Sequence, residues 1–228
     1  MITTIFLDLD DTLFSFQQAE QVALEETMRH YTLPYSDEIL ALYSAGNDAQ
    51  WKLLEQGKVQ RSEIGYRRFD LLLTHLGSDL DREEVNHYYM ERLSIRHFFL
   101  PGAEELLCAL HGRYTLCLAS NGTGWVQEGR LKSSGILPLL DRVFISEYLG
   151  ANKPQLGFFD ACFASLPGVK RSESLMLGDS LTSDMLGGKI AGMHTCWYNP
   201  NRLPLPTDGT VEYQIHRLPD LLPLLEKL

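Results

Sequence analysis

Short apolar runs that end in polar or acidic residues recur along this chain of 228 residues. The first, residues 2–9, is rich in β-branched and aromatic residues and runs into three aspartates, which indicates a buried strand followed by a charged loop. Similar runs at 114–119 and 174–177 end in Ser-Asn-Gly and Gly-Asp-Ser. Weaker strands are predicted at 142–146, 194–198 and 213–215.

Helical spacing fills the intervals between these predicted strands. Apolar residues at 103, 106, 107 and 110 keep the i, i+3, i+4, i+7 pattern, and segments 185–191 and 218–228 are further helix candidates. Strands that alternate with helices favour an α/β fold, a Rossmann-like and mostly parallel sheet with helices on both of its faces.

The long stretch between the first and second predicted strands has a different character. It contains no convincing strand and is too long for an ordinary loop, so it must have structure of its own. An apolar stripe from Phe69 to Leu76 is closed by Gly77, and Asp81 with Glu84 resembles a capping box that opens the next helix. We therefore predict an all-helical cap at 15–97, inserted into a core formed by 1–14 and 98–228.

Composition narrows the classes of function. The chain is 44% hydrophobic, with 20 Lys and Arg against 30 Asp and Glu, so the net charge of −10 disfavours long nucleic acids and anionic membranes as partners. There is no basic, apolar leader and no run of about 18 apolar residues, so we expect neither a signal peptide nor a membrane span. The four cysteines are expected to be small buried hydrophobes of a reducing compartment, the cytoplasm. Nothing in the sequence indicates an oligomeric state.

Polar residues that end the apolar runs should converge, because ligands of open α/β sheets bind outside the carboxyl ends of the strands. These residues are Asp8, Asp10, Asp11, Thr12, Ser120, Asn121, Asp179, Ser180 and Asp184, and Lys153 could reach the same edge. Carboxylates packed together repel one another unless a cation lies among them. Oxygen ligands without nearby His or Cys point to a hard cation such as Mg²⁺.

A metal beside a lysine, small hydroxyls and an amide suits a phosphoryl group. Asp8 could attack phosphorus as a carboxylate nucleophile. Asp10 would then be placed to protonate the leaving oxygen and later to activate water.

The same residues resemble four motifs of the haloacid dehalogenase-like (HAD) superfamily of phosphatases. The motifs are Asp8 to Leu13, Ser120-Asn121-Gly122, Lys153-Pro154, and Gly178-Asp179-Ser180 followed by Ser183-Asp184. Singly each is weak, but four in order over the whole chain are specific. The resemblance implies a HAD-like core with Asp8 as nucleophile and Asp10 as acid and base. It implies Mg²⁺ held by Asp8, the Asp10 carbonyl and Asp179, supported by Asp184, with Thr12, Ser120, Asn121 and Lys153 as phosphate-binding candidates.

A narrower resemblance suggests the substrate. Segments 143–147, 180–192 and 195–199 are similar to the YjjG-type pyrimidine 5′-nucleotidases, and in the cap Asn47, Trp51 and Arg68 fall at matching places. This similarity implies a phosphoric monoester hydrolase that acts on a small phosphorylated metabolite, a nucleoside 5′-monophosphate being the best single choice.

Several alternatives stay open at this point. A sugar-phosphate phosphatase, a phosphoglycolate-type phosphatase or a phosphomutase would share the motifs, and a non-enzymatic phospho-acceptor module would share the acidic cluster. Asp184 could cap a helix. Lys153 could be a plain surface residue, Trp51 could belong to the cap core, and Arg67 with Arg68 could form a solvated helix face.

Overall fold

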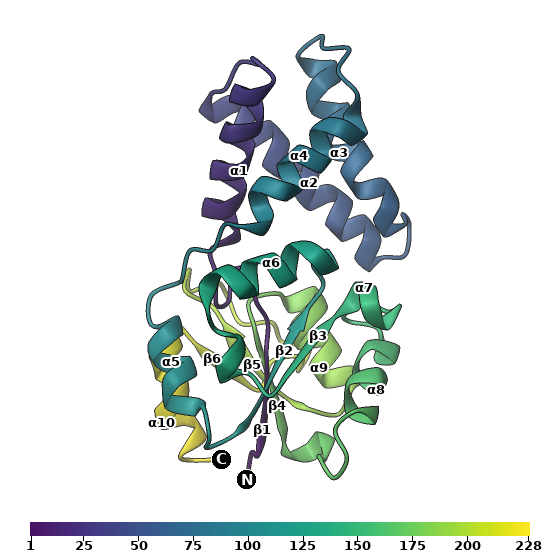
Figure 1. Ribbon diagram of the computed structural model, residues 1–228. Coiled ribbons are helices and arrows are strands. Elements are labelled where there is room, and N and C mark those ends of the chain that lie inside the picture. The colour runs from purple at the N-terminus through teal and green to yellow at the C-terminus, as the bar shows by residue number, and fades with distance from the viewer. The chain divides into compact units, whose positions relative to one another are not determined.

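The computed structural model describes all 228 residues, which divide into two compact units. Unit 1 combines Met1–Phe16 with His97–Leu228 and contains every strand, whereas unit 2 is the helical segment Gln17–Arg96 (Figure 1). The chain thus leaves unit 1 shortly after the first strand and returns before the second.

Unit 1 is built on a six-stranded sheet in which all neighbours are parallel. The strands are β1 (Thr4–Leu7), β2 (Thr115–Ser120), β3 (Arg142–Ile145), β4 (Ser174–Gly178), β5 (His194–Tyr198) and β6 (Tyr213–Ile215). Their order is β3-β2-β1-β4-β5-β6, so β1 lies between β2 and β4. The predicted α/β class with a parallel sheet is confirmed, and all six predicted strands are present.

Alternate residues along each strand supply two separate hydrophobic cores. Ile5 and Leu7 of β1 belong to the cluster that also contains residues of α5 and α10. Phe6, between them, belongs to a second cluster with Phe158 and Phe159 of α8. Since successive side chains of a strand point to opposite faces, helices must cover both faces, and Figure 1 shows them on either side of the sheet.

The helices of unit 1 are mostly short. They are α5 (Ala103–Leu110), α6 (Gly124–Ser134), α7 (Ser146–Leu149), α8 (Leu156–Ala164), α9 (Leu186–Ile190) and α10 (Leu221–Leu225), with 3₁₀ turns η1 (Leu137–Leu139), η2 (Arg171–Glu173) and η4 (Leu218–Asp220) and a π-helical segment η3 (Leu181–Met185). The helix predicted at 218–228 is a 3₁₀ turn followed by the brief α10, because Pro219 and Pro223 lack the N–H groups that a continuous helix needs.

Unit 2 consists of four helices: α1 (Phe16–His30), α2 (Asp37–Glu55), α3 (Arg61–His75) and α4 (Arg82–Ser94). As predicted, α3 ends before Gly77, which has a φ of +63°. Asp81 caps α4 by accepting hydrogen bonds from the backbone N–H groups of Glu83 and Glu84. Only this half of the expected capping box is present, and the Glu84 carboxylate instead accepts a hydrogen bond from the Tyr31 hydroxyl (3.4 Å).

A buried polar network lies inside unit 2. Glu20 accepts hydrogen bonds from Ser44 and Asn47, and the side-chain oxygen Oδ1 of Asn47 accepts one from Arg68 (2.9 Å). Arg68 also donates to Asn86 (2.8 Å). At 3% exposure Arg68 does not lie on a solvated face, so that reading of the sequence was wrong for this residue. The guanidinium can be buried because three neighbouring side chains, those of Asn47, Asn86 and Met90, accept its four hydrogen bonds.

Glu20 is expected to make stability fall as pH rises. Burial raises the pKa of Glu20 above 4.5, although hydrogen bonds from Ser44 and Asn47 oppose the shift. The folded state therefore holds this proton to higher pH than the unfolded state, and the free energy of unfolding decreases as pH passes from 4.5 through the raised pKa. Glu20→Gln keeps an acceptor for Asn47 and can donate to Ser44. The free energy of unfolding of this variant should therefore fall less over the same pH range.

Urea unfolding of both proteins across this pH range measures the difference. Glu25→Gln is the matched control, since Glu25 lies on the same helix but is only partly buried and is paired with Arg29 (2.8 Å). Equal pH slopes for the Glu20→Gln variant and the unsubstituted protein would contradict the expectation.

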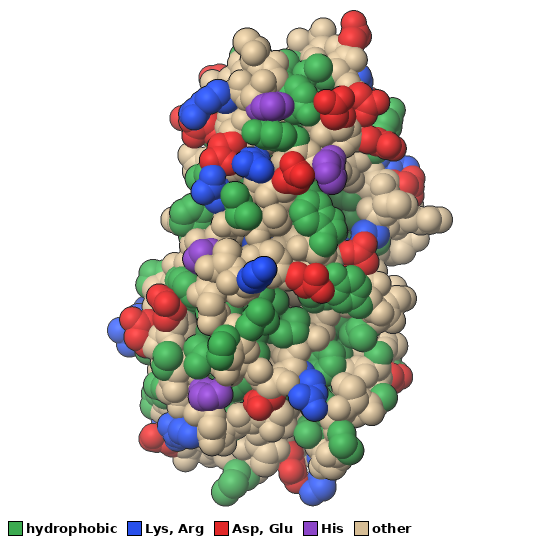
Figure 2. Space-filling view, in the orientation of Figure 1, with side chains coloured by type: hydrophobic (Ala, Val, Ile, Leu, Met, Phe, Trp, Pro, Cys, Tyr) green, Lys and Arg blue, Asp and Glu red, His purple; other side chains and the backbone are tan.

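The surface carries both signs of charge, and no helix could cross a bilayer. Lys and Arg side chains are scattered among acidic ones on the face drawn in Figure 2. None of the helices has both the length and the apolar run that a membrane span requires. Cys117, Cys162 and Cys196 are buried free thiols as predicted, but Cys108 is exposed because it lies on the outer side of the short α5.

Candidate active site

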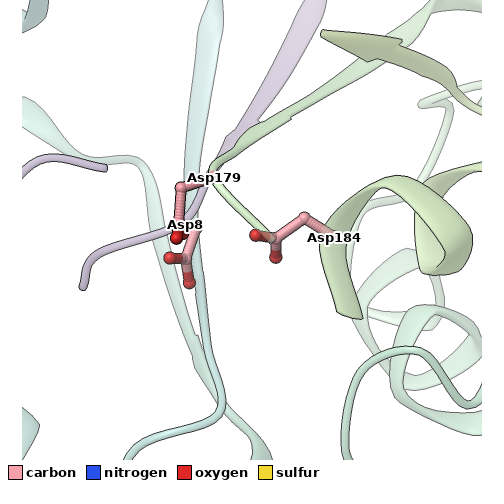
Figure 3. Close-up of side chains that lie close together, drawn as sticks. All are labelled: Asp8, Asp179 and Asp184. Atoms are coloured by element: carbon pink, nitrogen blue, oxygen red, sulfur yellow. The ribbon is translucent and has the colours of Figure 1, made fainter. Parts of the chain in front are cut away.

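Two central strands deliver carboxylates to the same edge of the sheet. Asp8 follows β1 and Asp179 follows β4, and the backbone N–H of Asp8 donates to the carbonyl of Leu177 (2.9 Å). Asp184 comes from η3, and its carboxylate points toward the other two (Figure 3). Each of the three offers an oxygen, and these oxygens all lie within 4.8 Å of one another. The sheet register thus produces the carboxylate cluster that the sequence predicts.

Lys153 lies among these carboxylates. Its ammonium group donates to Asp8 Oδ1 (2.7 Å), to Asp184 Oδ1 (2.6 Å) and to the carbonyl oxygen of Ala119 (2.6 Å). The side chain is 1% exposed, so the alternative of a plain surface lysine was wrong. All three protons of the ammonium therefore have acceptors, as a buried charge requires.

Asn121 anchors the loop that carries Lys153. Its side-chain oxygen accepts from the backbone N–H of Lys153 (2.8 Å), and its amide donates to the Lys153 carbonyl (2.9 Å). The structure therefore places the Asn121 side chain on the backbone of residue 153, where it joins the loop after β2 to the loop after α7.

Two hydroxyl groups complete this edge of the sheet. Thr12 lies within hydrogen-bond distance of Asp8 Oδ2 (3.4 Å) and Asp179 Oδ1 (3.3 Å). Ser120, the last residue of β2, accepts hydrogen bonds from the backbone N–H of Gly122 (3.0 Å) and the side chain of Gln127 (2.9 Å). Ser120 is 1% exposed.

Asp184 is held from two sides. Besides Lys153, it accepts a hydrogen bond from the backbone N–H of Ser180 (3.1 Å), so it closes the first turn of η3 and also pairs with the lysine. A Cβ at Gly178 would lie 2.2 Å from Asp184 Oδ2. Only glycine at 178 leaves room for the Asp184 carboxylate between β4 and η3.

Burial and mutual repulsion shift the pKa values of the groups in this cluster. Burial and the neighbouring charge of Asp184 raise the pKa of Asp8 to about 7, although Lys153 lowers it. Burial and the charge of Asp8 also raise the pKa of Asp179 well above its usual value. Burial acts to lower the pKa of Lys153, but the carboxylates of Asp184 and Asp8 outweigh it, so its pKa is raised and the lysine stays charged.

The donor set suits a hard divalent cation. One ammonium, that of Lys153, lies among three carboxylates, so this buried cluster carries more negative than positive charge. Carboxylate oxygens without His or Cys are ligands that Mg²⁺ prefers. The Thr12 hydroxyl lies between Asp8 and Asp179, within reach of one oxygen of each, and its single proton can be donated to either carboxylate.

Asp10 has partners that the sequence reasoning missed. Its Oδ2 accepts from Gln127 (2.7 Å), and its Oδ1 contacts the guanidinium of Arg130 in a salt bridge. Both residues belong to α6, for which no helix was predicted. A signal was present, since Gln127 and Arg130 share a helical face with Val126 and Leu131, and polar residues on a buried face need partners.

The three cap candidates all lie in unit 2, and two of them are in contact with each other. Asn47 and Arg68 form the buried network described above. Trp51, half-buried, packs against the small cluster of Leu54, Val59 and Ile64 and lies under the guanidinium of Arg61 at 5.5 Å.

The fold and the carboxylate cluster together define a hydrolase class. A family model of the haloacid dehalogenase-like hydrolases matches residues 2–192, and the chain belongs to this family. Pyrimidine 5′-nucleotidase PynA of Streptococcus pneumoniae is 37% identical over 98% of this chain and 94% of its own length. Pyrimidine 5′-nucleotidase YjjG of Escherichia coli is 30% identical over 98% and 97%.

A solved structure is similar over both units. The crystal structure of the HAD-hydrolase YfnB from Bacillus subtilis, 33% identical, superimposes with a TM-score of 0.93 and covers 98% of each chain. That structure is bound to magnesium and reveals interdomain movement. The resemblance first seen in four short motifs is therefore confirmed.

Proposed function

We propose that this hydrolase is a Mg²⁺-dependent phosphomonoesterase that works through a phosphoaspartate at Asp8. The observation that carries the proposal is the carboxylate cluster of Asp8, Asp179 and Asp184 with the buried ammonium of Lys153 inside it. Three acids around one lysine leave negative charge uncompensated, and a bound divalent cation would balance it.

Each residue then has a chemical role. An Asp8 oxygen attacks phosphorus while the bond to the leaving oxygen breaks, and Asp10 gives that oxygen a proton. Asp10 next takes a proton from water, which attacks phosphorus and breaks the bond to Asp8, so that phosphate leaves and the carboxylate is restored. Lys153 and Ser120 bind phosphoryl oxygens, and Asn121 keeps Lys153 in place.

Mg²⁺ would be held by Asp8, the Asp10 carbonyl and Asp179, with Asp184 oriented by Lys153 and Ser180 as support. When bound, it neutralises charge that develops on the phosphoryl group. The family to which the chain belongs, the magnesium in the YfnB crystal and the oxygen-only donor set all support this assignment.

We propose nucleoside 5′-monophosphates of the pyrimidine type as substrates. The support is that PynA and YjjG, both matched over nearly the whole chain, are pyrimidine 5′-nucleotidases. Unit 2 would act as the cap that selects the substrate, and the buried free thiols fit an enzyme of the reducing cytoplasm.

Phosphate release from UMP, dUMP, dTMP and several sugar phosphates, measured with and without Mg²⁺, tests the proposal. We expect turnover of the nucleotides with Mg²⁺, and preference for a sugar phosphate would overturn the substrate class alone. Failure to hydrolyse any of these esters would overturn the function itself.

Removing the metal is expected to lower thermal stability as well as activity. A cation that binds only the folded protein stabilises it by about 2.7 kcal/mol at a hundred times its Kd. Melting curves recorded with EDTA and with Mg²⁺ should show this shift, and Asp179→Asn should reduce it. Asp160→Asn is the control, because Asp160 pairs with Arg171 (2.6 Å), away from the cluster. An equal shift in the Asp179→Asn variant would contradict the ligand assignment.

A further inference from the structure

The side chain of Asp10 is gripped by two residues of one helix. Gln127 donates to Oδ2 and Arg130 to Oδ1, so each oxygen of the carboxylate has its own donor. Arg130 also donates to Gln127 Oε1 (3.0 Å), which joins the two donors to each other. The carboxylate is 29% exposed, but Arg130 is only 1% exposed and Gln127 only 2%.

We propose that Arg130 and Gln127 are positioning residues that orient the Asp10 carboxyl group for proton transfer. Donors on both oxygens fix the rotamer and the plane of the carboxyl group, and each oxygen keeps a further lone pair toward the open side. This inference rests on the proposed phosphatase function, and it adds two residues that act through Asp10 without touching the phosphoryl group.

Gln127 also connects the proton-transfer group to the phosphate-binding edge. Its amide nitrogen donates both to Asp10 Oδ2 (2.7 Å) and to Ser120 Oγ (2.9 Å). A Cβ at Gly122 would lie 2.1 Å from the same nitrogen, so a glycine there makes room for Gln127. The side-chain amide of Gln127 thus connects α6 both to the loop after β1 and to the end of β2.

Arg130 holds the loop after β1 by a second contact. Its guanidinium lies over the ring of Phe14 at 5.6 Å, four residues beyond Asp10. Burial of an arginine is costly unless its charge is paired, and Asp10 provides that charge. The pair therefore fixes both the side chain of Asp10 and the turn that carries it.

The need for a proton on the leaving oxygen predicts which substrates are hydrolysed more slowly when Arg130 and Gln127 no longer hold Asp10. In the first step Asp10 gives its proton to the leaving oxygen as the P–O bond breaks. An alkoxide such as a nucleoside 5′-oxygen needs that proton, whereas 4-nitrophenolate leaves without it. Misplacing Asp10 should therefore lower kcat/KM, which reports formation of the phosphoenzyme, far more for alkyl phosphates than for 4-nitrophenyl phosphate, whereas the later attack of water should slow equally for both.

The test compares kcat/KM for UMP and for 4-nitrophenyl phosphate in Arg130→Gln and Gln127→Ala. We expect kcat/KM for UMP to fall about 10- to 100-fold, and that for 4-nitrophenyl phosphate to fall less than about threefold. Arg171→Gln is the matched control, since Arg171 also pairs with an aspartate and lies over a phenylalanine ring, at the amino end of β4.

Combination with Asp10→Asn sharpens the result. If Arg130 acts through Asp10, Arg130→Gln should cost almost nothing further in the Asp10→Asn background. Equal losses on both substrates, or a full additional loss in that background, would overturn the positioning role. Should Arg130→Gln fail to fold, Gln127→Ala decides by the same two criteria. Inactivity of the unsubstituted protein on both esters would instead overturn the proposed function.

Discussion

Asp8→Asn is expected to lower kcat for phosphate release by at least about 10⁴-fold, the scale seen when a nucleophile is removed. The amide that replaces the carboxylate cannot form the phosphoaspartate, and it also removes one ligand of the cation. Steady-state phosphate release and acid-quench detection of the phosphoenzyme measure the loss. Neither should detect product or intermediate above background.

Asp11→Asn is the matched control for this variant. Asp11 is in the same loop, but its side chain accepts a hydrogen bond from the backbone N–H of Phe16 (2.9 Å), which asparagine can also do. Its φ of +54° is likewise tolerated by asparagine. Full activity in the Asp8→Asn variant would overturn the covalent mechanism.

Lys153→Met should have the second large effect, this time on stability as well as on activity. Removing the ammonium leaves the carboxylates of Asp8 and Asp184 buried without their partner. Breaking a buried ion pair in this way typically costs about 3–5 kcal/mol. Urea unfolding in EDTA measures the loss, and Mg²⁺ should recover part of it. Phosphate release should become undetectable, because no cation from the protein then faces the phosphoryl group.

Lys170→Met serves as the control, since Lys170 pairs with Glu173 (2.7 Å) on the exposed surface of the same unit. It should unfold at the same urea concentration as the unsubstituted protein. The charge balance proposed for the cluster fails if Lys153→Met in EDTA is as stable as this control.

Asp8 and Asp179 of the acidic cluster could be predicted from sequence because they directly follow apolar runs. A strand that ends in Asp8 and another that ends before Asp179 must bring both residues to one edge if the strands are parallel, and they are. For Lys153 the sequence alone left two readings open, a residue that reaches the same edge and a plain surface lysine, since a lysine before a proline has no local signature of burial. Its phosphate-binding role came from the resemblance to known motifs.

The grip on Asp10 could not be predicted in the same way. Gln127 and Arg130 lie more than a hundred residues from Asp10 in sequence, on a helix whose apolar pattern is interrupted by these residues. Their burial depends on a tertiary partner, and no periodicity identifies which acid that partner is. The exposure of Arg68 was misjudged for the same reason, because its guanidinium donates hydrogen bonds to Asn47 and Asn86, which lie on two other helices.

The point where the chain leaves and re-enters unit 1 has a consequence for protein engineering. Phe14 and Phe99 form an antiparallel bridge, and backbone hydrogen bonds join Ser15 to Phe98 (2.7 Å) and Leu100 to Leu13 (2.9 Å). The two ends of the inserted segment are therefore already side by side, so a tight turn could replace all of Gln17–Arg96 at little entropic cost. Unit 1 is in this sense a hydrolase core with a natural insertion site, at which other helical segments could replace Gln17–Arg96.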